Sequence, residues 1–362
     1  WEIGYTGLMK DGKDKPKGRG TGLNPDSRYA AWTRETADDG WWPEEASTPR
    51  TTLLLDTARS VISRNESPDI PFDRSINPYR GCEHGCIYCY ARPSHAWLGL
   101  SPGLDFETRI AHKPDAAARL RQELARPGYR AAPIALGGNT DCYQPVERRL
   151  RLTRSILEVL AETGHPVCLV TKSAAVLRDL DLLADLARDG LARVAFSVTT
   201  LDPELARRLE PRAAAPRRRL EAMAALAAAA VPVGVLFSPA IPAVNDHELE
   251  RVLTAAAEAG AGHANFMLLR LPSELADLFR DWLAEHYPDR QAHVFSLLSQ
   301  MHDGKIGESR FGLRMRGQGP LAELLSRRFD LACRRLGLGA PPSLDGSRFR
   351  PPRKDEAQGC LF

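Results

Sequence analysis

The sequence predicts an α/β fold, a partial (β/α)6 barrel of the TIM type with N- and C-terminal extensions. Short apolar runs alternate with helix-like segments between about residues 75 and 286. The connections between them are only a few residues long, which favours right-handed βαβ units and a parallel sheet. Polar segments follow the apolar runs, and in this architecture the functional site lies at the carboxyl ends of the strands. These three observations together predict both the fold and the place of the site.

Six strands are expected in this region. The first, Ser75–Tyr79, directly precedes a segment rich in cysteine. The other five are short apolar runs at Ala132–Leu136, Val167–Val170, Arg193–Thr199, Val231–Phe237 and Asn265–Leu271. Eight strands would close a full barrel, so six predict an open or partial one.

The segments between the strands carry apolar residues at helical spacing. One helix is expected to begin at Asp202-Pro203, because Asp can cap a helix and Pro suits its first position. Asn245 is expected to cap another helix, which Gly260 ends. Further helices are expected at Asp115–Arg126, Val146–Leu160, Val176–Ala187, Ser273–His286, Ala292–Met301 and Leu321–Leu336.

The chain is expected to divide into three parts. Residues 1–74 form an N-terminal extension rich in Gly, Pro and charge, with Thr51–Ser60 as a short strand lying against the main body. Residues 75–286 form the core that carries the strand and helix alternation. Residues 287–362 form a C-terminal helical extension, which ends in a Pro- and Arg-rich tail expected to be mobile.

Composition bounds the class of protein. The chain has 362 residues, is 43% hydrophobic and has a formal net charge of +3, so it neither requires nor excludes a polyanionic partner. No signal peptide or membrane span is expected, and seven irregularly spaced cysteines favour a reducing cytoplasm. Basic runs such as Arg217-Arg218-Arg219 and Arg348–Lys354 could contact phosphates, although most helical Arg residues lie on solvated faces.

The segment GCEHGCIYC holds Cys82, Cys86 and Cys89 in the spacing Cys-x3-Cys-x2-Cys. Thiolates this close can bind a soft metal or an iron–sulfur cluster. A structural zinc would need a fourth ligand, for which His84 or His95 is available. Cys333 or Cys360 could also fold back as a fourth ligand. A four-iron cluster can instead be held by three cysteines, with one iron left open to a substrate or cofactor.

This spacing, with an aromatic residue before the last cysteine at the start of an alternating β/α chain, resembles the radical S-adenosylmethionine (SAM) superfamily. The resemblance covers about residues 75–286. Four segments, NPYRGCEHGCIYCYAR, GGNTDCYQPVE, LVTKS and SVTTLDPELARRLEPRAA, are similar to the branch related to spore photoproduct lyase, as is the KGRG stretch at Lys17–Gly20. The branch is often called "DNA repair photolyase"-like, which does not by itself establish DNA repair.

The resemblance implies a [4Fe–4S] cluster on the three cysteines, with SAM chelating the open iron. Reductive cleavage of SAM would then give a 5′-deoxyadenosyl radical that abstracts hydrogen from substrate. The place of other residues in the fold suggests contacts to SAM: Tyr88 with the adenine, Gly137, Gly138, Asn139 and Thr140 with the methionine amino group, Lys172 with the carboxylate, and Ser197 and Thr199 with the ribose. A packed aromatic, a simple turn, a surface lysine and ordinary strand residues remain the plain alternatives.

Two further residues are candidates for returning hydrogen to the product radical. In spore photoproduct lyase a tyrosine and a cysteine outside the cluster have this role. Tyr90 follows the last cluster cysteine here, and Cys142 lies near the corresponding loop, although it could equally be a bystander thiol. Cys168 lies within a strand and is expected in the core.

The expected partners are SAM, a low-potential electron donor such as flavodoxin or ferredoxin, and a nucleic acid lesion or modified nucleotide as substrate, with no membrane. Modification of a peptide or small molecule is the second possibility within this class. A different class also stays open: a non-catalytic iron–sulfur or zinc-binding interaction protein.

Overall fold

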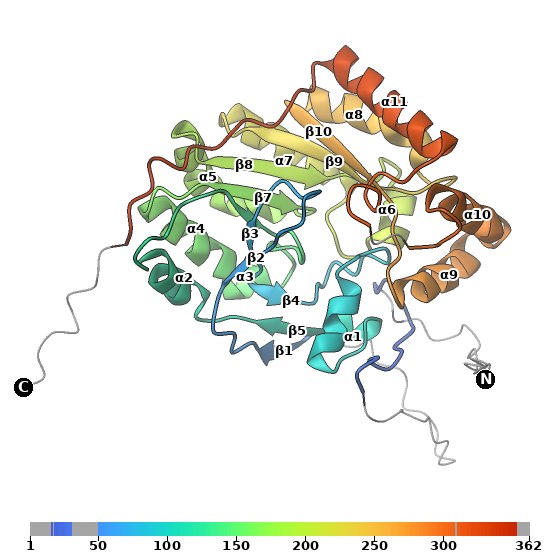
Figure 1. Ribbon diagram of the computed structural model, residues 1–362, viewed down its shortest axis with the longest axis horizontal. Coiled ribbons are helices and arrows are strands. Elements are labelled where there is room, and N and C mark those ends of the chain that lie inside the picture. The colour runs from blue at the N-terminus through green and yellow to red at the C-terminus, as the bar shows by residue number, and fades with distance from the viewer. Residues whose placement is uncertain (1–15, 17, 31–49, 308–309, 353–362) are drawn as a thin grey trace, which may run out of the picture.

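The computed structural model describes residues 16, 18–30, 50–307 and 310–352. Its centre is an open sheet in the order β10-β9-β8-β7-β6-β3-β2 (Figure 1). Its six parallel strands are β3 (Arg74–Ile76), β6 (Ile134–Leu136), β7 (Val167–Thr171), β8 (Ala192–Ser197), β9 (Val233–Ala240) and β10 (His263–Leu268). β2 (Ile62–Arg64) pairs antiparallel with β3 at one edge. Since β2 and β10 do not pair with each other in the described chain, the predicted partial barrel of six parallel strands is confirmed.

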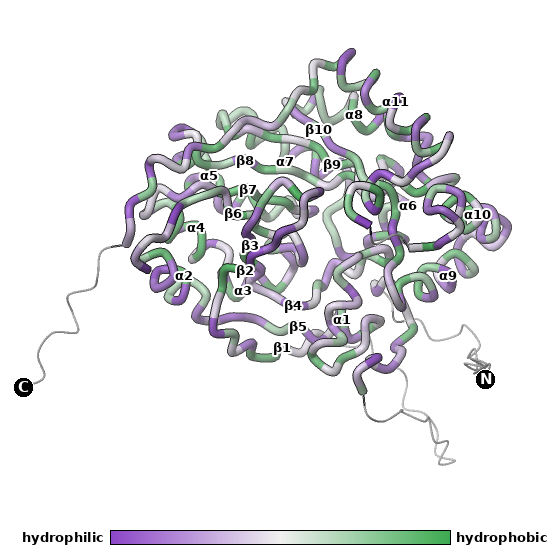
Figure 2. The backbone as a smooth tube through the Cα atoms, in the orientation of Figure 1, coloured by the Kyte–Doolittle hydropathy of each residue, from purple (hydrophilic) through white to green (hydrophobic). Residues whose placement is uncertain are grey.

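The strands form because their residues are apolar and bury side chains on both faces of the sheet. Leu136, Val194 and Val235 are each fully buried, on three different strands. Figure 2 shows the central strands as mainly hydrophobic, with hydrophilic residues on the outer turns of the surrounding helices. The sheet is therefore a rigid base on which the ends of the strands are held.

Helices connect the strands, and α2, α4, α5, α7 and α8 contribute apolar residues to one core with the sheet. Asp202 accepts a hydrogen bond from the Glu204 amide at 2.8 Å, which confirms the predicted helix start. The connecting helices are α2 (Ala116–Leu124), α3 (Glu147–Leu150), α4 (Leu152–Glu162), η2 (Ala174–Asp179), α5 (Leu180–Arg188), α6 (Pro203–Leu209), α7 (Pro216–Ala228), η3 (Asp246–Glu248) and α8 (Leu249–Glu258).

Two predicted helix features are wrong in detail. The helix expected over Val146–Leu160 is broken at Arg151, whose φ of 53° lies in the left-handed region. Asn245 does not cap η3 or α8. Its side chain instead accepts from the Ile241 amide at 2.6 Å and donates to the Thr199 carbonyl at 2.8 Å. A side-chain amide that can join the ends of two strands satisfies more buried backbone there than at a helix end.

A second sheet lies beside the first and has the order β1-β5-β4. β1 (Thr52–Leu55) confirms the short strand predicted in the N-terminal extension, and it pairs in parallel with β5 (Arg109–His112). β5 and the short helix α1 (Leu104–Thr108) before it were not predicted. β4 (Tyr79–Arg80) pairs with β5, and the cysteine segment follows β4 directly. This sheet therefore supports one end of the cysteine loop.

The C-terminal part packs at two places (Figure 1). α9 (Leu275–His286), η4 (Pro288–Arg290) and α10 (Gln291–Met301) follow β10, and α11 (Pro320–Leu336) packs on α8. The tail expected to be mobile is anchored as far as residue 352. The Arg350 amide donates to the Thr163 carbonyl at 2.8 Å, and the Phe349 ring packs 5.4 Å from that of Tyr129. Its apolar and backbone contacts, which the sequence pattern does not show, account for the difference.

Within the described residues, no helix has the length and apolar character needed to cross a membrane.

Candidate active site

Three cysteine thiols lie in the loop between β4 and the short helix η1 (Arg92–Leu98). Cys82, Cys86 and Cys89 form no disulfide, and the first two are buried. Burial, followed by Asp141 and the other two thiols, raises the pKa of Cys82 well above its usual value. Burial likewise raises the pKa of Cys86 to about 12. The three thiols therefore act on one another electrostatically, and ionising all of them calls for a bound metal or cluster.

The three thiols do not surround a single metal ion. Among the described residues, no group of three or more His, Cys, Asp or Glu side chains has the arrangement of a metal-ion site. His84 Nδ1 lies 3.4 Å from an Asp141 oxygen without hydrogen-bond geometry, and the His95 ring packs edge-on against Phe106 with 5.5 Å between centroids. A mononuclear zinc site needs four ligands at 2.0–2.3 Å. Three nearby but separated thiols fit a polynuclear cluster better, with one thiolate on each of three irons.

Arg92 holds the cysteine loop in place from beneath. Its side chain is fully buried and donates to the carbonyls of Cys86 at 2.9 Å, Gly85 at 3.0 Å and Gly103 at 2.9 Å. It also forms a buried ion pair with Glu107 at 2.5 Å. A planar guanidinium can satisfy several carbonyls and a carboxylate at once. The loop backbone is thereby fixed independently of any bound group.

The N-terminal KGRG stretch packs against the same loop. The Gly20 amide donates to Glu107 at 2.8 Å, and Arg19 donates to the Glu107 carbonyl at 2.9 Å. A Cβ on Gly20 would lie 1.9 Å from the Gly85 carbonyl oxygen, so only glycine fits there. Gly18–Gly20 therefore completes the support of the cysteine loop. The first residue of the stretch, Lys17, lies outside the described residues.

Tyr88 is fixed by a buried polar group on the far side of the loop. Its hydroxyl donates to Glu210 and lies 3.1 Å from the Thr199 hydroxyl oxygen. Burial alone would raise the pKa of Glu210, but Arg219 and then Lys172 hold it at about 2. The Tyr88 side chain is thus held in one orientation.

Glu210 and Arg219 were not predicted as site residues. Glu210 stands in the motif that carried the family resemblance, but no chemistry was assigned to it. Arg219 was grouped with Arg217 and Arg218 as a basic run. That grouping is wrong, because Arg219 forms a buried ion pair with Glu210 whereas the other two pair with Glu221 at the surface. Arg219 lies on the same face of the helix as Met223, four residues later. An apolar residue at that spacing indicates that Arg219 faces the core.

The loop Gly137–Thr140 follows β6 and has a defined shape. Gly137 has a φ of 83°, and a Cβ there would lie 2.4 Å from the Val170 carbonyl oxygen. The amide of Asn139 donates to the Asn77 side chain at 3.1 Å, while the Thr140 hydroxyl donates to a carbonyl of β4 at 2.7 Å. The shape of the loop thus depends on Gly137 at its first position and on the Asn77 side chain, which accepts the hydrogen bond from Asn139.

Lys172 directly follows β7, and its charge lies near Cys86 of the cysteine loop. Its amide donates to Asp141 at 2.7 Å, and its Nζ lies 5.7 Å from the centre of the Tyr88 ring. Burial would lower the pKa of Lys172, but Cys86 and Glu210 raise it above its usual value. A lysine kept protonated between thiols and an aromatic ring is suited to neutralise an anionic group of a ligand.

Comparison with known proteins decides the family. A family model described as the Radical SAM superfamily matches residues 76–256, half of the chain. The chain belongs to the radical SAM superfamily. The match begins at the last residue of β3 and includes the cysteine loop, Tyr88, the Gly137–Thr140 loop and Lys172. The family implies a [4Fe–4S] cluster and SAM as cofactors.

Several uncharacterized proteins are similar in sequence to this chain. The uncharacterized protein Rv2578c of Mycobacterium tuberculosis is 39% identical over 222 residues, which cover 61% of this chain and 65% of that protein. The uncharacterized protein MJ0683 of Methanocaldococcus jannaschii is 25% identical over 214 residues, 59% of this chain and 76% of that protein. The chain therefore spans a little less than two thirds of the length of its mycobacterial relative.

Solved structures of spore photoproduct lyase share the fold. The enzyme complexed with dinucleoside spore photoproduct has a TM-score of 0.57 and 17% identity, covering 79% of this chain and 80% of that one. A mutant with bound AdoMet and the same dinucleoside has a TM-score of 0.55 and 16% identity, with the same coverage. The predicted resemblance to this branch of the radical SAM superfamily is confirmed at the level of the fold.

Ser197 and Thr199, predicted to contact the ribose, are occupied elsewhere. The Ser197 hydroxyl donates to the Ser238 carbonyl at 3.1 Å, and the Thr199 hydroxyl donates to Glu210 at 2.8 Å. Both side chains are almost completely buried. Their hydrogen bonds join β8 to β9 and support Tyr88, and contact of either residue with the ribose stays a prediction.

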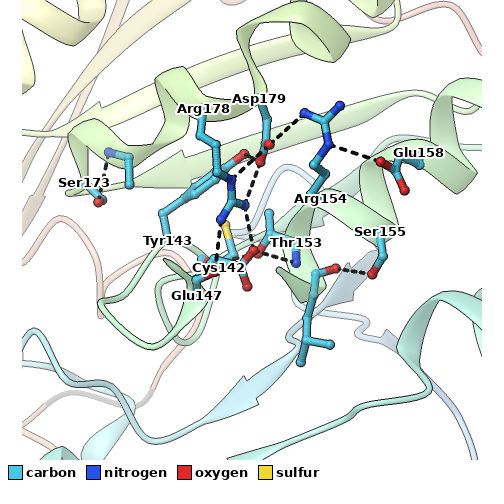
Figure 3. A network of polar contacts seen from close by, with 12 residues as sticks. Cys142, Tyr143, Glu147, Thr153, Arg154, Ser155, Glu158, Ser173, Arg178 and Asp179 are labelled. Atoms are coloured by element: carbon cyan, nitrogen blue, oxygen red, sulfur yellow. Dashed lines mark hydrogen bonds and ion pairs between the residues drawn. The ribbon is translucent and has the colours of Figure 1, made fainter. Parts of the chain in front are cut away.

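Cys142 and Tyr90, the two predicted hydrogen donors, lie in different surroundings. Cys142 is fully buried in the core beneath Gly137, and Figure 3 shows it beside the buried network in which Arg178 bridges Glu147 and Asp179. This burial favours a packing role for Cys142 and gives the donor prediction no support. Tyr90 is 43% exposed, and its hydroxyl donates to the Gly138 carbonyl.

The remaining cysteines are remote in the sequence from the three-thiol loop. Cys168 lies on β7 and is only partly buried, close to Arg193, so the prediction of a core residue holds in part. Cys333 lies on α11 and packs against the sheet core, on a different element from the loop. Cys360 lies outside the described residues.

Proposed function

We propose that the chain is a radical SAM enzyme whose [4Fe–4S] cluster is held by Cys82, Cys86 and Cys89. When bound, the cluster supplies one electron that splits SAM into methionine and a 5′-deoxyadenosyl radical, which abstracts hydrogen from substrate. The observation that carries the proposal is the loop of three free, mutually interacting thiols at the carboxyl end of a six-stranded parallel sheet. The flavodoxin or ferredoxin class would deliver the electron.

Each residue around the loop has a part in this proposal. Tyr88, held by Glu210, would lie against the adenine. The Gly137–Thr140 loop, which follows β6 and is shaped by Asn77, would meet the amino group of SAM. Lys172 would pair with the SAM carboxylate. Holding these groups in place before SAM binds lowers the cost of ordering the cofactor.

The proposed substrate is a nucleic acid lesion or a modified nucleotide. The similarity in fold to spore photoproduct lyase supports it, since that enzyme was solved with a dinucleoside spore photoproduct. Tyr90, which is accessible beside the cysteine loop, remains the better of the two proposed hydrogen donors. The division into an extension over residues 1–74, a core over 75–286 and a helical extension over 287–362 is also a proposal, and so is a cytoplasmic location.

The proposal is tested by anaerobic reconstitution of the full chain with iron and sulfide. We expect about four iron atoms per chain, a brown chromophore, and 5′-deoxyadenosine after reduction in the presence of SAM. Cys86→Ala should lose the chromophore and form no 5′-deoxyadenosine. Cys333→Ala is the matched control and should retain both, because Cys333 lies on α11.

Two results would contradict the proposal. One is a single colourless metal ion per chain, which would indicate a zinc-binding module. The other is an intact four-iron chromophore that forms no 5′-deoxyadenosine on reduction, which would indicate an iron–sulfur protein without SAM cleavage.

A further inference from the structure

Arg270 carries a charge that the described chain does not neutralise. It lies two residues beyond the end of β10 and is half-buried. No hydrogen bond or ion pair joins its guanidinium to any described residue. Burial, and then the neighbouring Arg314, lower its pKa below the usual value. A half-buried guanidinium has five N–H donors, and leaving them without acceptors costs free energy.

The position of Arg270 relates it to the proposed active site. Its guanidinium carbon lies 5.6 Å from the centre of the Tyr90 ring, and Tyr90 directly follows Cys89. Tyr90 is 43% exposed, so its ring is accessible to solvent. Arg270 therefore lies over an accessible aromatic ring next to the cysteine loop.

Three carboxylates already have partners: Asp69, which acts on Arg270, and Asp141 and Glu210, which act on the cysteine loop. Asp69 is held by Arg314 at 2.6 and 2.7 Å. Asp141 accepts backbone amides at 2.7 and 2.8 Å. Glu210 forms a buried ion pair with Arg219. None of these three carboxylates is available to neutralise a further cation.

Lys172 and Arg270 both act electrostatically on Tyr90, but each contacts a different aromatic ring. The Nζ of Lys172 lies near Cys86 and 5.7 Å from the Tyr88 ring, on the side assigned to SAM. Arg270 lies against Tyr90 instead. SAM has a single carboxylate, which Lys172 would take. The charge of Arg270 is left for the other ligand, the substrate.

We propose that Arg270 binds a phosphate group of a nucleotide substrate, with Tyr90 as the adjacent aromatic surface. The inference rests on the proposed function and deepens it, because it assigns the residue that recognises the substrate. A guanidinium pairs with phosphate through two parallel hydrogen bonds. An arginine beside an aromatic ring is the combination that proteins use for the backbone and the bases of single-stranded nucleic acids. A carboxylate on a peptide is the competing anion.

The test measures binding of a fluorescein-labelled, single-stranded thymidine octanucleotide to the reconstituted full chain in the presence of SAM. Arg270→Gln should weaken binding about tenfold or more, because a charged hydrogen-bond pair is lost. It should also reduce the slope of log affinity against log salt by about one. Arg270→Lys should recover part of the loss. Arg316→Gln is the matched control, an exposed arginine of the neighbouring loop, and should bind within about twofold of the unaltered chain.

Several results would overturn the inference. They are equal affinity of Arg270→Gln and the unaltered chain, equal loss in Arg316→Gln, or no octanucleotide binding by the unaltered chain. A labelled glutamate-rich octapeptide serves as the competing anion, and a loss in Arg270→Gln confined to this peptide would overturn it too. Formation of 5′-deoxyadenosine by the unaltered chain is measured in parallel. Its absence would count against the proposed function, whereas its presence with any of these results would count against Arg270 alone.

Discussion

Two arginines near the cysteine loop have opposite surroundings. Arg92 is fully buried, and the chain supplies all of its partners, including the Glu107 carboxylate. Arg270 is half-buried and, among the described residues, has only the Tyr90 ring and distant charges around it. The chain completes its own hydrogen bonding where Arg92 supports the cysteine loop. Among the described residues, it leaves the hydrogen bonding of Arg270 incomplete, where we propose that the substrate binds.

The same contrast holds for the tyrosines of the loop. The Tyr88 hydroxyl is held by Glu210 and Thr199 and is buried. Tyr90, two residues later, is accessible and touches only the Gly138 carbonyl through its hydroxyl. Tyr88 is therefore a buried supporting residue of the loop, whereas Tyr90 is accessible.

The largest effect is expected at Arg92. Arg92→Met would leave the Glu107 carboxylate buried without its cation, and breaking such a pair costs about 3–5 kcal/mol. The free energy of unfolding, measured by urea denaturation, should fall by that amount. The control is Arg188→Met, whose ion pair with Asp185 is exposed and contributes at most about 1 kcal/mol. Similar losses in the two variants would remove the distinction between supporting and exposed arginines.

A smaller effect is expected at Gly20. In Gly20→Ala the new methyl group would lie 1.9 Å from the Gly85 carbonyl oxygen, so the N-terminal stretch must move away from the loop. We expect a loss of about 1–3 kcal/mol in the free energy of unfolding. We also expect faster bleaching of the reconstituted chromophore in air, because the loop is less well supported.

Gly262→Ala is the control for this prediction. A Cβ at Gly262 would meet no atom within 4 Å, so the stability should stay within about 0.5 kcal/mol of the unaltered chain. Bleaching of Gly20→Ala at the rate of the control would show that the N-terminal stretch does not support the loop.

The smallest effect is expected on the open side, at the ion pair of Asp69 with Arg314. Hydrogen bonding to Arg314 lowers the pKa of Asp69 to about 2. A lowered carboxyl pKa in the folded state stabilises the fold above the unfolded value of about 3.9, and this contribution is lost as the pH falls toward 2. The stability of the unaltered chain should therefore fall more steeply between pH 4.5 and 3 than that of Asp69→Asn.

The size of this effect should be about 1 kcal/mol, because only part of the stabilisation from a pKa lowered to about 2 is lost between pH 4.5 and 3. Arg314→Gln should flatten the same part of the pH profile, and combining both substitutions should add little further. Identical profiles for Asp69→Asn and the unaltered chain would mean that the pair does not tie the two segments together.

Much of the fold could be predicted from the sequence. The predicted strand Val167–Val170 became β7 (Val167–Thr171), and Arg193–Thr199 became β8 (Ala192–Ser197). Apolar runs of this length between polar turns have few ways to be buried, and a parallel sheet covered by helices is one of them. The short elements β5 and α1 were missed because their sequence, from Leu104 to His112, has no clear period and is held by tertiary contacts.

The site was predicted unevenly. The cysteine loop, Tyr88 and Lys172 are predicted as site residues because their residue types and spacing match a family motif, and their roles stay predictions. Glu210 and Arg219 were not predicted, because buried and exposed ion pairs use the same residue types and the sequence alone does not distinguish them. The same ambiguity affected Ser197, Thr199 and Cys142, whose burial and partners depend on which strand or loop lies opposite.

The sequence by itself determined the parallel order of the strands, the end of the sheet where chemistry is placed, and the three thiols of the loop. These follow from local periodicity, short connections and covalent spacing along one chain. Only the tertiary structure decided which charges are neutralised. Arg92, Arg219 and Arg270 are the same residue type, and what separates them is the set of distant groups that folding brings within hydrogen-bond reach.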